Sequence, residues 1–141
     1  MSFNDVHRAR LLVFQALYQM QMSKVSEIQD ITEQFKAENL QKKYCREYFS
    51  SMLESFPAFQ AQVDKILEGL IKEFSLQEVS PVELSICRLA VFELLIRKDT
   101  PYKVIITEAL KIQQKYGTDD GFKFVNGVLD EASKLIRADE I

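Results

Sequence analysis

Four neighbouring residues near the C-terminus carry side chains suited to holding a flat, charged ligand. Phe122, Lys123, Phe124 and Asn126 supply two aromatic faces, an amine and an amide in one short segment. If the segment is a helix, at ~100° per residue its apolar positions share one buried stripe, which comprises Val125, Val128, Leu129, Ala132 and Ile136. Both rings fall on the edges of that stripe: Phe124 lies roughly 90° from its centre and Phe122 roughly 70° on the other side. They could stack on a ligand, or they could fill gaps between helices, where aromatic residues are common.

A second group of candidate ligand-binding residues lies at the N-terminus. His7, Arg8 and Arg10 occupy the first turns of a predicted helix, and both arginines lie off its expected buried stripe. Single-stranded RNA is held by cations along its backbone and by aromatic faces under its bases. The combination of this group with the C-terminal rings therefore predicts an RNA contact.

The charge distribution limits the kind of nucleic-acid binding that is possible. The net charge of −3 argues against indiscriminate binding by bulk electrostatics. Residues 1–24 and residues 97–123 are each net +2, whereas residues 25–80 are net −4. Any nucleic-acid surface is therefore expected to join the first helix to the C-terminal third.

Catalytic and metal chemistry find little support in the sequence. There is one histidine, His7, and no Gly-rich phosphate loop, nucleophile elbow or cluster of metal ligands. Asp119 and Asp120 are best explained as an acidic first helical turn. Cys45 and Cys87 are isolated and predict reduced, partly buried thiols in a cytoplasmic protein. We expect no catalytic residue, metal, cofactor, secretory signal or membrane span.

The chain that must position these residues is expected to be all-α. With 141 residues, of which 47% are hydrophobic, it suits one domain over residues 1–141. Glycine and proline are scarce, and apolar residues recur every three or four positions. The prediction is a compact bundle of about seven helices in two packed sub-bundles, with a hinge at residues 72–80.

Several helix ends can be predicted from local residue types. The first helix should run from about Asn4 to Met22, and a second should begin at Ser26 with a capping box to Gln29. Pro57 should separate a third helix from a fourth. Three further starts are predicted at Ser80-Pro81 with Glu83 as its capping-box partner, at Thr100-Pro101, and at Thr118.

The positions of two glycines predict a structural reason for each. Gly117 suits the left-handed end of a helix. Gly127 lies inside the last helix, where glycine costs up to ~1 kcal/mol relative to alanine, so a close packing partner is expected.

Four ordered blocks resemble the NusB family of bacterial transcription antitermination factors. The first reads RAR at 8–10 followed by QALYQ at 15–19; the others read CRLAVFEL at 87–94, PYKVIITEA at 101–109 and KFVNGVL at 123–129. They cover the first helix and roughly residues 84–132, in the order and spacing of the family. Residues 24–80 are not diagnostic.

The resemblance implies a fold of two packed helical sub-bundles and a set of binding partners. In the family these are the boxA element of ribosomal RNA leaders and the small-subunit ribosomal protein NusE, and the pair nucleates an antitermination complex on RNA polymerase. Carried over by position, the RNA surface comprises His7, Arg8, Arg10, Phe122, Lys123, Phe124 and Asn126, with Asp120 at its border. Tyr18 and Glu83 fall where the family meets NusE. Tyr18 also lies one step off the buried stripe, as suits an interface tyrosine.

The chain departs from the family pattern in two places. Two alternative functions also stay open. Many relatives have a longer arginine run where this chain has residues 5–10, so RNA binding by the isolated protein should be weak. Thr107 replaces the usual asparagine. One alternative is the NusB-like N-terminal domain of ribosomal RNA cytosine methyltransferases, whose large cofactor domain is not expected here. The other is a helical adaptor that binds only proteins, and the sequence permits either a monomer or a homodimer.

Overall fold

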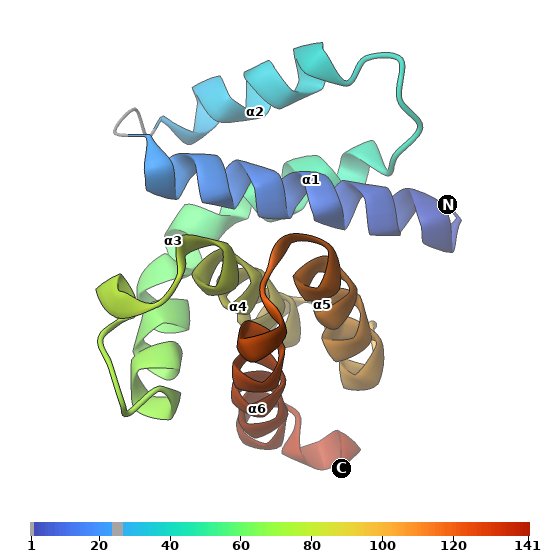
Figure 1. The fold of residues 1–141 in the computed structure, drawn as a ribbon. Helices are drawn as coiled ribbons and strands as arrows, with labels where there is room; N and C mark the ends of the chain where they lie inside the picture. The colour runs from blue at the N-terminus through green and yellow to red at the C-terminus, as the bar shows by residue number, and fades with distance from the viewer. Residues whose placement is uncertain (1, 24–26) are drawn as a thin grey trace. The chain divides into compact units, whose positions relative to one another are not determined.

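The computed structural model describes residues 2–23 and 27–141, and the all-helical prediction is confirmed (Figure 1). These residues contain no strand and form six α-helices and two short 3-10 helices. In chain order they are α1 (Phe3–Met22), α2 (Ile28–Glu38), α3 (Arg46–Leu70), η1 (Leu76–Glu78), α4 (Pro81–Ile96), α5 (Tyr102–Tyr116), α6 (Asp119–Ile136) and η2 (Ala138–Glu140). The chain divides into two compact units, Met1–Ala58 and Phe59–Ile141.

The predicted helix break at Pro57 is wrong, and this explains why there are fewer helices than expected. Pro57 lies inside the continuous helix α3. It removes one backbone donor, but buried side chains on both sides of it, including Phe56 and Val63, favour the helix through packing. The boundary between the two compact units lies inside the same helix, after Ala58. The hinge predicted at residues 72–80 is therefore also wrong, because that segment lies within the second unit.

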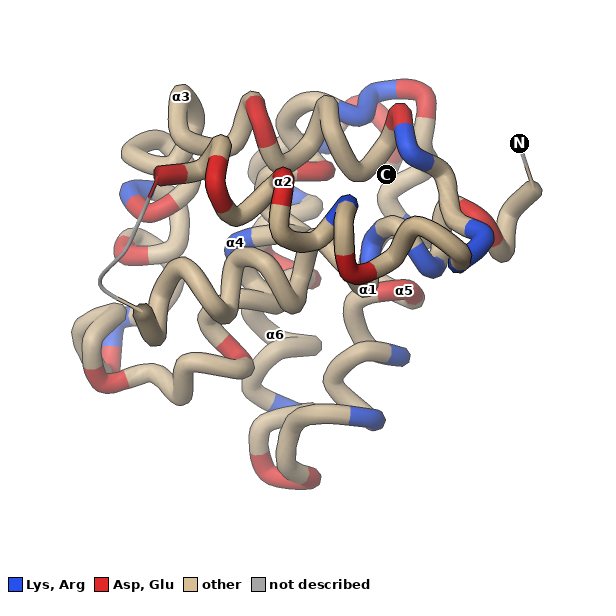
Figure 2. Tube along the Cα trace, turned by 90° about the horizontal axis from the view of Figure 1, so that it is seen from above, with Lys and Arg blue, Asp and Glu red and all other residues tan. Residues whose placement is uncertain are grey.

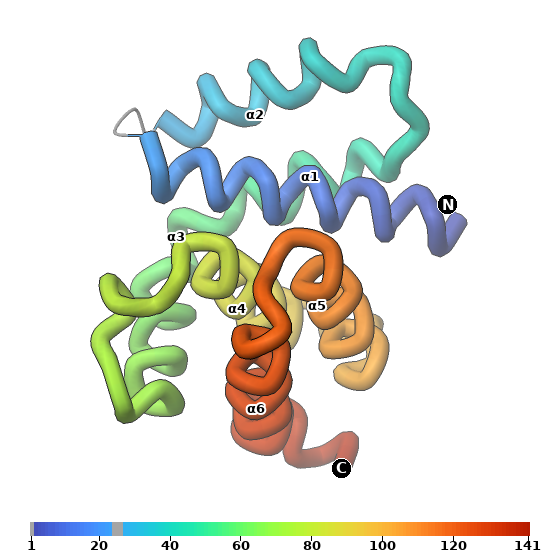
Figure 3. Tube along the Cα trace, in the orientation of Figure 1, coloured from blue at the N-terminus to red at the C-terminus, as the bar shows by residue number. Residues whose placement is uncertain are grey.

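The first unit is organised by the capped start of α1 and by an aromatic cluster. The Ser2 hydroxyl accepts a hydrogen bond from the Asp5 amide at 3.1 Å, and the Cys45 amide donates to the Asp5 carbonyl at 2.9 Å. Helix α2 packs on α1 (Figure 3). Phe49 contacts the rings of Phe35 and Tyr44, with centroids 6.1 and 6.0 Å apart. The capping box predicted at Ser26 lies outside the described residues.

The second unit is built on three mutually packed helices. Helices α4, α5 and α6 contact one another pairwise, and Figure 3 follows the chain through them. The ring of Phe92 on α4 lies 5.5 Å from that of Phe59 on α3. Arg88 also joins these two helices, because its Nε and Nη2 donate to the two Asp64 carboxylate oxygens at 2.9 and 3.1 Å. Bidentate geometry of this kind fixes orientation as well as adding attraction.

The end of α6 closes the turn between α4 and α5. Arg137 is only 1% exposed, and its guanidinium donates to the carbonyls of Leu94, Arg97 and Thr100 at 2.8 to 2.9 Å. It also donates to Glu140, whose second oxygen accepts from the Tyr102 amide at 3.1 Å. We call Arg137 and Glu140 the C-terminal clamp. It satisfies carbonyls at the end of α4 and a free amide at the start of α5.

The clamp makes the stability of the second unit sensitive to acid. The hydrogen bond from the Tyr102 amide, helped by the Arg137 guanidinium, holds the pKa of Glu140 below its ordinary value of 4.5. A depressed carboxylate pKa contributes stability above the unfolded-state pKa, and that stability is lost as pH falls through the folded-state pKa. We expect Glu140→Gln to flatten the fall in unfolding free energy between neutral pH and about pH 3. Urea titrations at several pH values measure this, with Asp139→Asn, at the neighbouring carboxylate outside the clamp, as the matched control.

Candidate nucleic-acid interface

The start of α6 carries the predicted aromatic segment on a well-capped helix. The Thr118 hydroxyl accepts from the Gly121 amide at 2.9 Å, and Asp119 and Asp120 form the acidic first turn as expected. Acidic side chains there complement the helix dipole. The predicted core stripe is confirmed at four positions, because Val125, Val128, Leu129 and Ala132 are buried.

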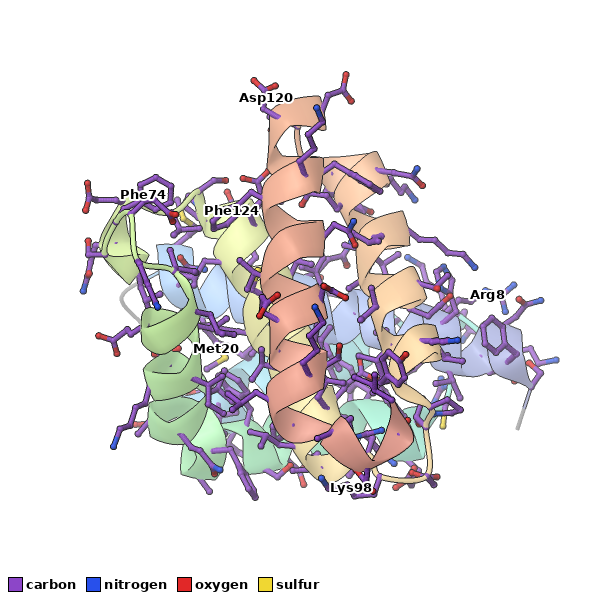
Figure 4. All side chains as sticks on the ribbon, turned by 90° about the horizontal axis from the view of Figure 1, so that it is seen from below. Arg8, Met20, Phe74, Lys98, Asp120 and Phe124 are labelled. Atoms are coloured by element: carbon purple, nitrogen blue, oxygen red, sulfur yellow. The ribbon has the colours of Figure 1, made fainter. Side chains whose placement is uncertain are left out.

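Phe124 borders an open pocket instead of the core. It is half-buried, and its ring centroid lies 5.9 Å from that of Phe74 at a tilt of 55°. Figure 4 shows these two rings side by side, with Asp120 at the beginning of the helix. The pocket has a volume of about 290 Å³, and its lining comprises Phe74, Glu78, Val79, Ser80, Glu83, Thr118, Asp120, Gly121 and Phe124. We call it the Phe124 pocket.

Phe122 faces a different hollow. It is half-buried and lines a second open pocket of about 240 Å³ together with Gln114, Thr118, Asp119 and Lys123. Lys123 and Asn126 are both exposed. The structure therefore brings Phe122 and Lys123 together on one side of the α6 start, and Phe124 and Asp120 together on the other.

A buried polar network lies beneath the Phe124 pocket. One oxygen of Glu83, Oε2, accepts from Gln113 Nε2 at 2.8 Å and from the amide and hydroxyl of Thr118 at 3.4 and 3.3 Å. Gln113 Nε2 also donates to the Thr118 carbonyl at 3.1 Å. The network joins α4, α5 and the N-cap of α6, so it fixes where the aromatic segment begins.

The capping role predicted for Glu83 is wrong. The Ser80 N-cap makes no side-chain capping bond, and the Glu83 carboxylate is 8% exposed and directed to Thr118. The Glu83 side chain points to Gln113 and Thr118 because these residues supply hydrogen-bond donors, which a buried carboxylate requires. A capping box occurs instead at the start of the preceding 3-10 helix η1, between Ser75 and Glu78. Contact of Glu83 with a partner protein stays a prediction.

Two glycines near this network have a steric reason, whereas a third has none. A Cβ at Gly121 would lie 1.8 Å from Glu83 Oε2, and a Cβ at Gly117 would lie 2.1 Å from Gln113 Nε2. Gly117 has φ −97°, so its predicted left-handed conformation is wrong. The close partner predicted for Gly127 is also wrong, because a Cβ there meets nothing within 4 Å. Glycine at 117 and 121 therefore leaves room for the network.

The predicted N-terminal cations have different environments. The Arg8 side chain is 53% exposed, lies 3.4 Å from the Asp5 carboxylate and donates to the Lys43 carbonyl. Arg10 is only 3% exposed and lies over the Tyr48 ring, 5.4 Å from its centroid. The expectation that Arg10 lies off the buried face is wrong, because its long apolar stem and guanidinium pack on an aromatic ring. RNA contact by Arg10 stays a prediction; His7 and Tyr18 are half-buried.

The charged groups of the described residues are dispersed, and the two thiols are buried. Basic and acidic positions are interspersed along the described helices (Figure 2). Cys45 and Cys87 are free and buried, and burial, helped by the charge of Glu83, raises the pKa of the Cys87 thiol to about 12. Such a thiol stays protonated and unreactive. Within residues 2–23 and 27–141, no group of three or more His, Cys, Asp or Glu could hold a metal ion.

No described helix combines the length and the apolar character that crossing a membrane requires.

Phe74 is the site residue that the sequence does not reveal. It follows the end of α3 in a short irregular segment and is 43% exposed. Helical periodicity gives no signal there, and Phe124 is far away in the sequence. Only the packing of the second unit brings the two rings together.

Comparison with known proteins identifies relatives along nearly the whole chain. The NusB family model matches residues 7–134. The transcription antitermination protein NusB of Marinobacter nauticus is 42% identical over 136 residues, covering 96% of this chain and 85% of that protein. That of Shewanella amazonensis is 41% identical over 128 residues, covering 91% and 94%.

Solved structures agree with these sequence relatives. The structure of T. maritima NusB is 32% identical, with a TM-score of 0.81 over 91% of this chain and 89% of that one. A crystal structure of the antitermination factors NusB and NusE in complex with double-stranded RNA has a TM-score of 0.84 over 95% and 99%, at 23% identity. At that identity the second likeness shows the fold alone.

Proposed function

Because the chain belongs to the NusB family, we propose that it is a transcription antitermination factor that binds boxA RNA together with the ribosomal protein NusE. In this role it acts in the cytoplasm as a non-catalytic member of a complex on RNA polymerase. Residues 1–141 serve as one functional domain, to which each compact unit contributes binding residues.

One observation carries the RNA-binding part of the proposal. Phe124 is only half-buried and borders an open pocket at a rigidly capped helix start, while the core of the same helix is filled by its neighbours. The ring is therefore available for stacking without loss of the core. Lys123 and Asn126 are exposed close by and can contact phosphate and base edges.

Further contacts with RNA and with NusE are proposed for other residues of each unit. The exposed Arg8 is the better N-terminal candidate for a phosphate contact, because Arg10 is buried against Tyr48. His7, Asp120 and Phe122 are proposed to border the RNA. Tyr18, which is half-buried, and Glu83 are proposed to contact NusE.

The direct test of RNA binding replaces the Phe124 ring by a charged side chain. We expect Phe124→Asp to weaken boxA binding by roughly 5- to 100-fold, because one good base stack contributes ~1–3 kcal/mol. Fluorescence anisotropy of labelled boxA RNA, with and without NusE, measures the loss. Leu135→Asp is the matched control, since Leu135 is an exposed apolar residue at the other end of the same helix.

Each outcome separates the proposal from its alternatives. Normal helical content and NusE binding with lost RNA binding support it. Unfolding of Phe124→Asp but not of Leu135→Asp would show that the ring is a core residue. Loss of NusE binding with no RNA binding even by the unchanged protein would favour an adaptor that binds only proteins.

A further inference from the structure

The Phe124 pocket has a second aromatic wall. Phe74 is 43% exposed, and its ring meets that of Phe124 at a tilt of 55°, so the two rings form an open angle instead of a closed stack. Phe74 is held by its surroundings: the adjacent Ser75 amide and hydroxyl both bond to Glu78 Oε1, at 2.9 and 3.1 Å. The ring is thus presented from a fixed turn that precedes η1.

The size of the pocket suits one flat ring system. Its volume of about 290 Å³ lies at the lower limit of the ~300–1,000 Å³ typical of drug-sized ligand sites. An aromatic face provides a platform for any planar group, and bases stacked on aromatic side chains are a common means of holding single-stranded RNA.

The polar lining of the pocket is rich in acceptors. Among the described residues that line it there is no lysine or arginine, while Glu78 and Asp120 contribute carboxylates to the lining. The Thr118 hydroxyl is already used, since it donates to Glu83 and accepts from the Gly121 amide. An ionised carboxylate only accepts hydrogen bonds, so this lining favours a base edge that carries N–H donors.

We propose that Phe74 and Phe124 together form a base-specific pocket that takes a guanine of the bound RNA. Guanine offers two adjacent donors on its Watson–Crick edge, the ring N–H and the 2-amino group, whereas uracil offers one donor between two acceptors. Glu78 is assigned as the acceptor for these donors through its Oε2, because Oε1 already accepts from the Ser75 amide and hydroxyl. This inference rests on the proposed RNA-binding function and adds base preference to it.

Electrostatics decides which part of the RNA enters the pocket. Carboxylates at the rim repel phosphate, so the backbone must remain outside while the neutral base enters. Lys123 lies exposed on the other side of the α6 start, beside Phe122. Phosphate contacts there and a base in the Phe124 pocket give the RNA two different kinds of attachment at one helix end.

The experiment uses the full chain, NusE and boxA RNA, with an anisotropy titration. Phe74→Leu keeps apolar bulk but removes the aromatic face, whereas Phe74→Tyr keeps the face. We expect the leucine variant to bind boxA RNA roughly 5- to 50-fold more weakly and the tyrosine variant to bind within about 3-fold of the unchanged protein. The slope of log affinity against log salt should not change, because no phosphate contact is lost.

Base preference is tested on the RNA side. Replacing each guanine in turn by inosine removes its 2-amino group, and one replacement should weaken binding to the unchanged protein. The same replacement should have no effect on Glu78→Gln, which places an amide donor opposite the base. If no guanine responds, or if Phe74→Leu binds like the unchanged protein, the inference is wrong while the RNA-binding function stands.

Two further outcomes are informative. If the unchanged protein with NusE does not bind boxA RNA, the proposed function itself fails. If Phe74→Leu weakens NusE binding in the absence of RNA, the pocket contacts the protein partner, and the guanine assignment is overturned.

Discussion

Replacing Arg137 by methionine is expected to lower the free energy of unfolding of the second unit by ~3–5 kcal/mol. The side chain is almost fully buried and donates to three carbonyls and to Glu140. Methionine fills much of the volume but donates no hydrogen bond. The carbonyl groups at the end of α4 would therefore lose their partners in a buried site that water reaches poorly. Leaving a buried polar group unpaired costs ~1–3 kcal/mol.

Urea unfolding followed by far-UV circular dichroism measures this loss. Lys134→Met is the matched control, because Lys134 is exposed in the last turn of α6, just before Arg137, and its ion pairs with Asp130 and Glu131 lie at the surface. Exposed pairs contribute ~0–1 kcal/mol. Arg137→Lys should recover only part of the loss, since one ammonium cannot reproduce the fork of a guanidinium. An Arg137→Met protein as stable as the control would contradict the clamp.

Adding a methyl group at two glycines of α6 is expected to have opposite effects. At Gly127 the new Cβ meets open space, so alanine should stabilise the helix by up to ~1 kcal/mol. At Gly121 the new Cβ would displace Glu83 from its bonds to Gln113 and Thr118. Loss of those bonds should exceed the gain in helix propensity and give a net destabilisation of ~1–3 kcal/mol.

The two glycine variants are controls for each other, because the helix and the substitution are the same. Thermal or urea unfolding gives the stabilities. Gly121→Ala should also weaken boxA RNA binding, since Glu83 and Gly121 both line the Phe124 pocket, whereas Gly127→Ala should not. Equal effects of the two substitutions on stability would show that the Glu83 network does not constrain the start of α6.

Much of the helical framework could be predicted because its signals are local. The apolar stripe from Val125 to Ala132 and the acidic turn at Asp119 follow from periodicity and from the helix dipole, and both occur in the structure. Pro57 misled the prediction because the local cost of proline in a helix was outweighed by packing on either side. Rules based on local sequence do not include this packing contribution.

The candidate site was predictable only in part. Phe124 could be recognised because its position on the helix separates it from the core stripe. Phe74 could not, since its neighbour in space belongs to a distant segment. The predictions for Arg10 and Glu83 are wrong for a related reason. Each polar group is buried against a partner from another helix: Arg10 against Tyr48 and Glu83 against Gln113.

The C-terminal clamp also has a consequence for the lifetime of the folded state. Its hydrogen bonds join Arg137 to carbonyls 37 to 43 positions earlier in the sequence. Contacts between distant segments require large loops to close, and interactions that form after the folding barrier affect mainly the unfolding rate. We therefore expect the clamp to form after the folding barrier and to slow unfolding. Without it, the folding rate of the second unit should hardly change, whereas its unfolding rate should rise.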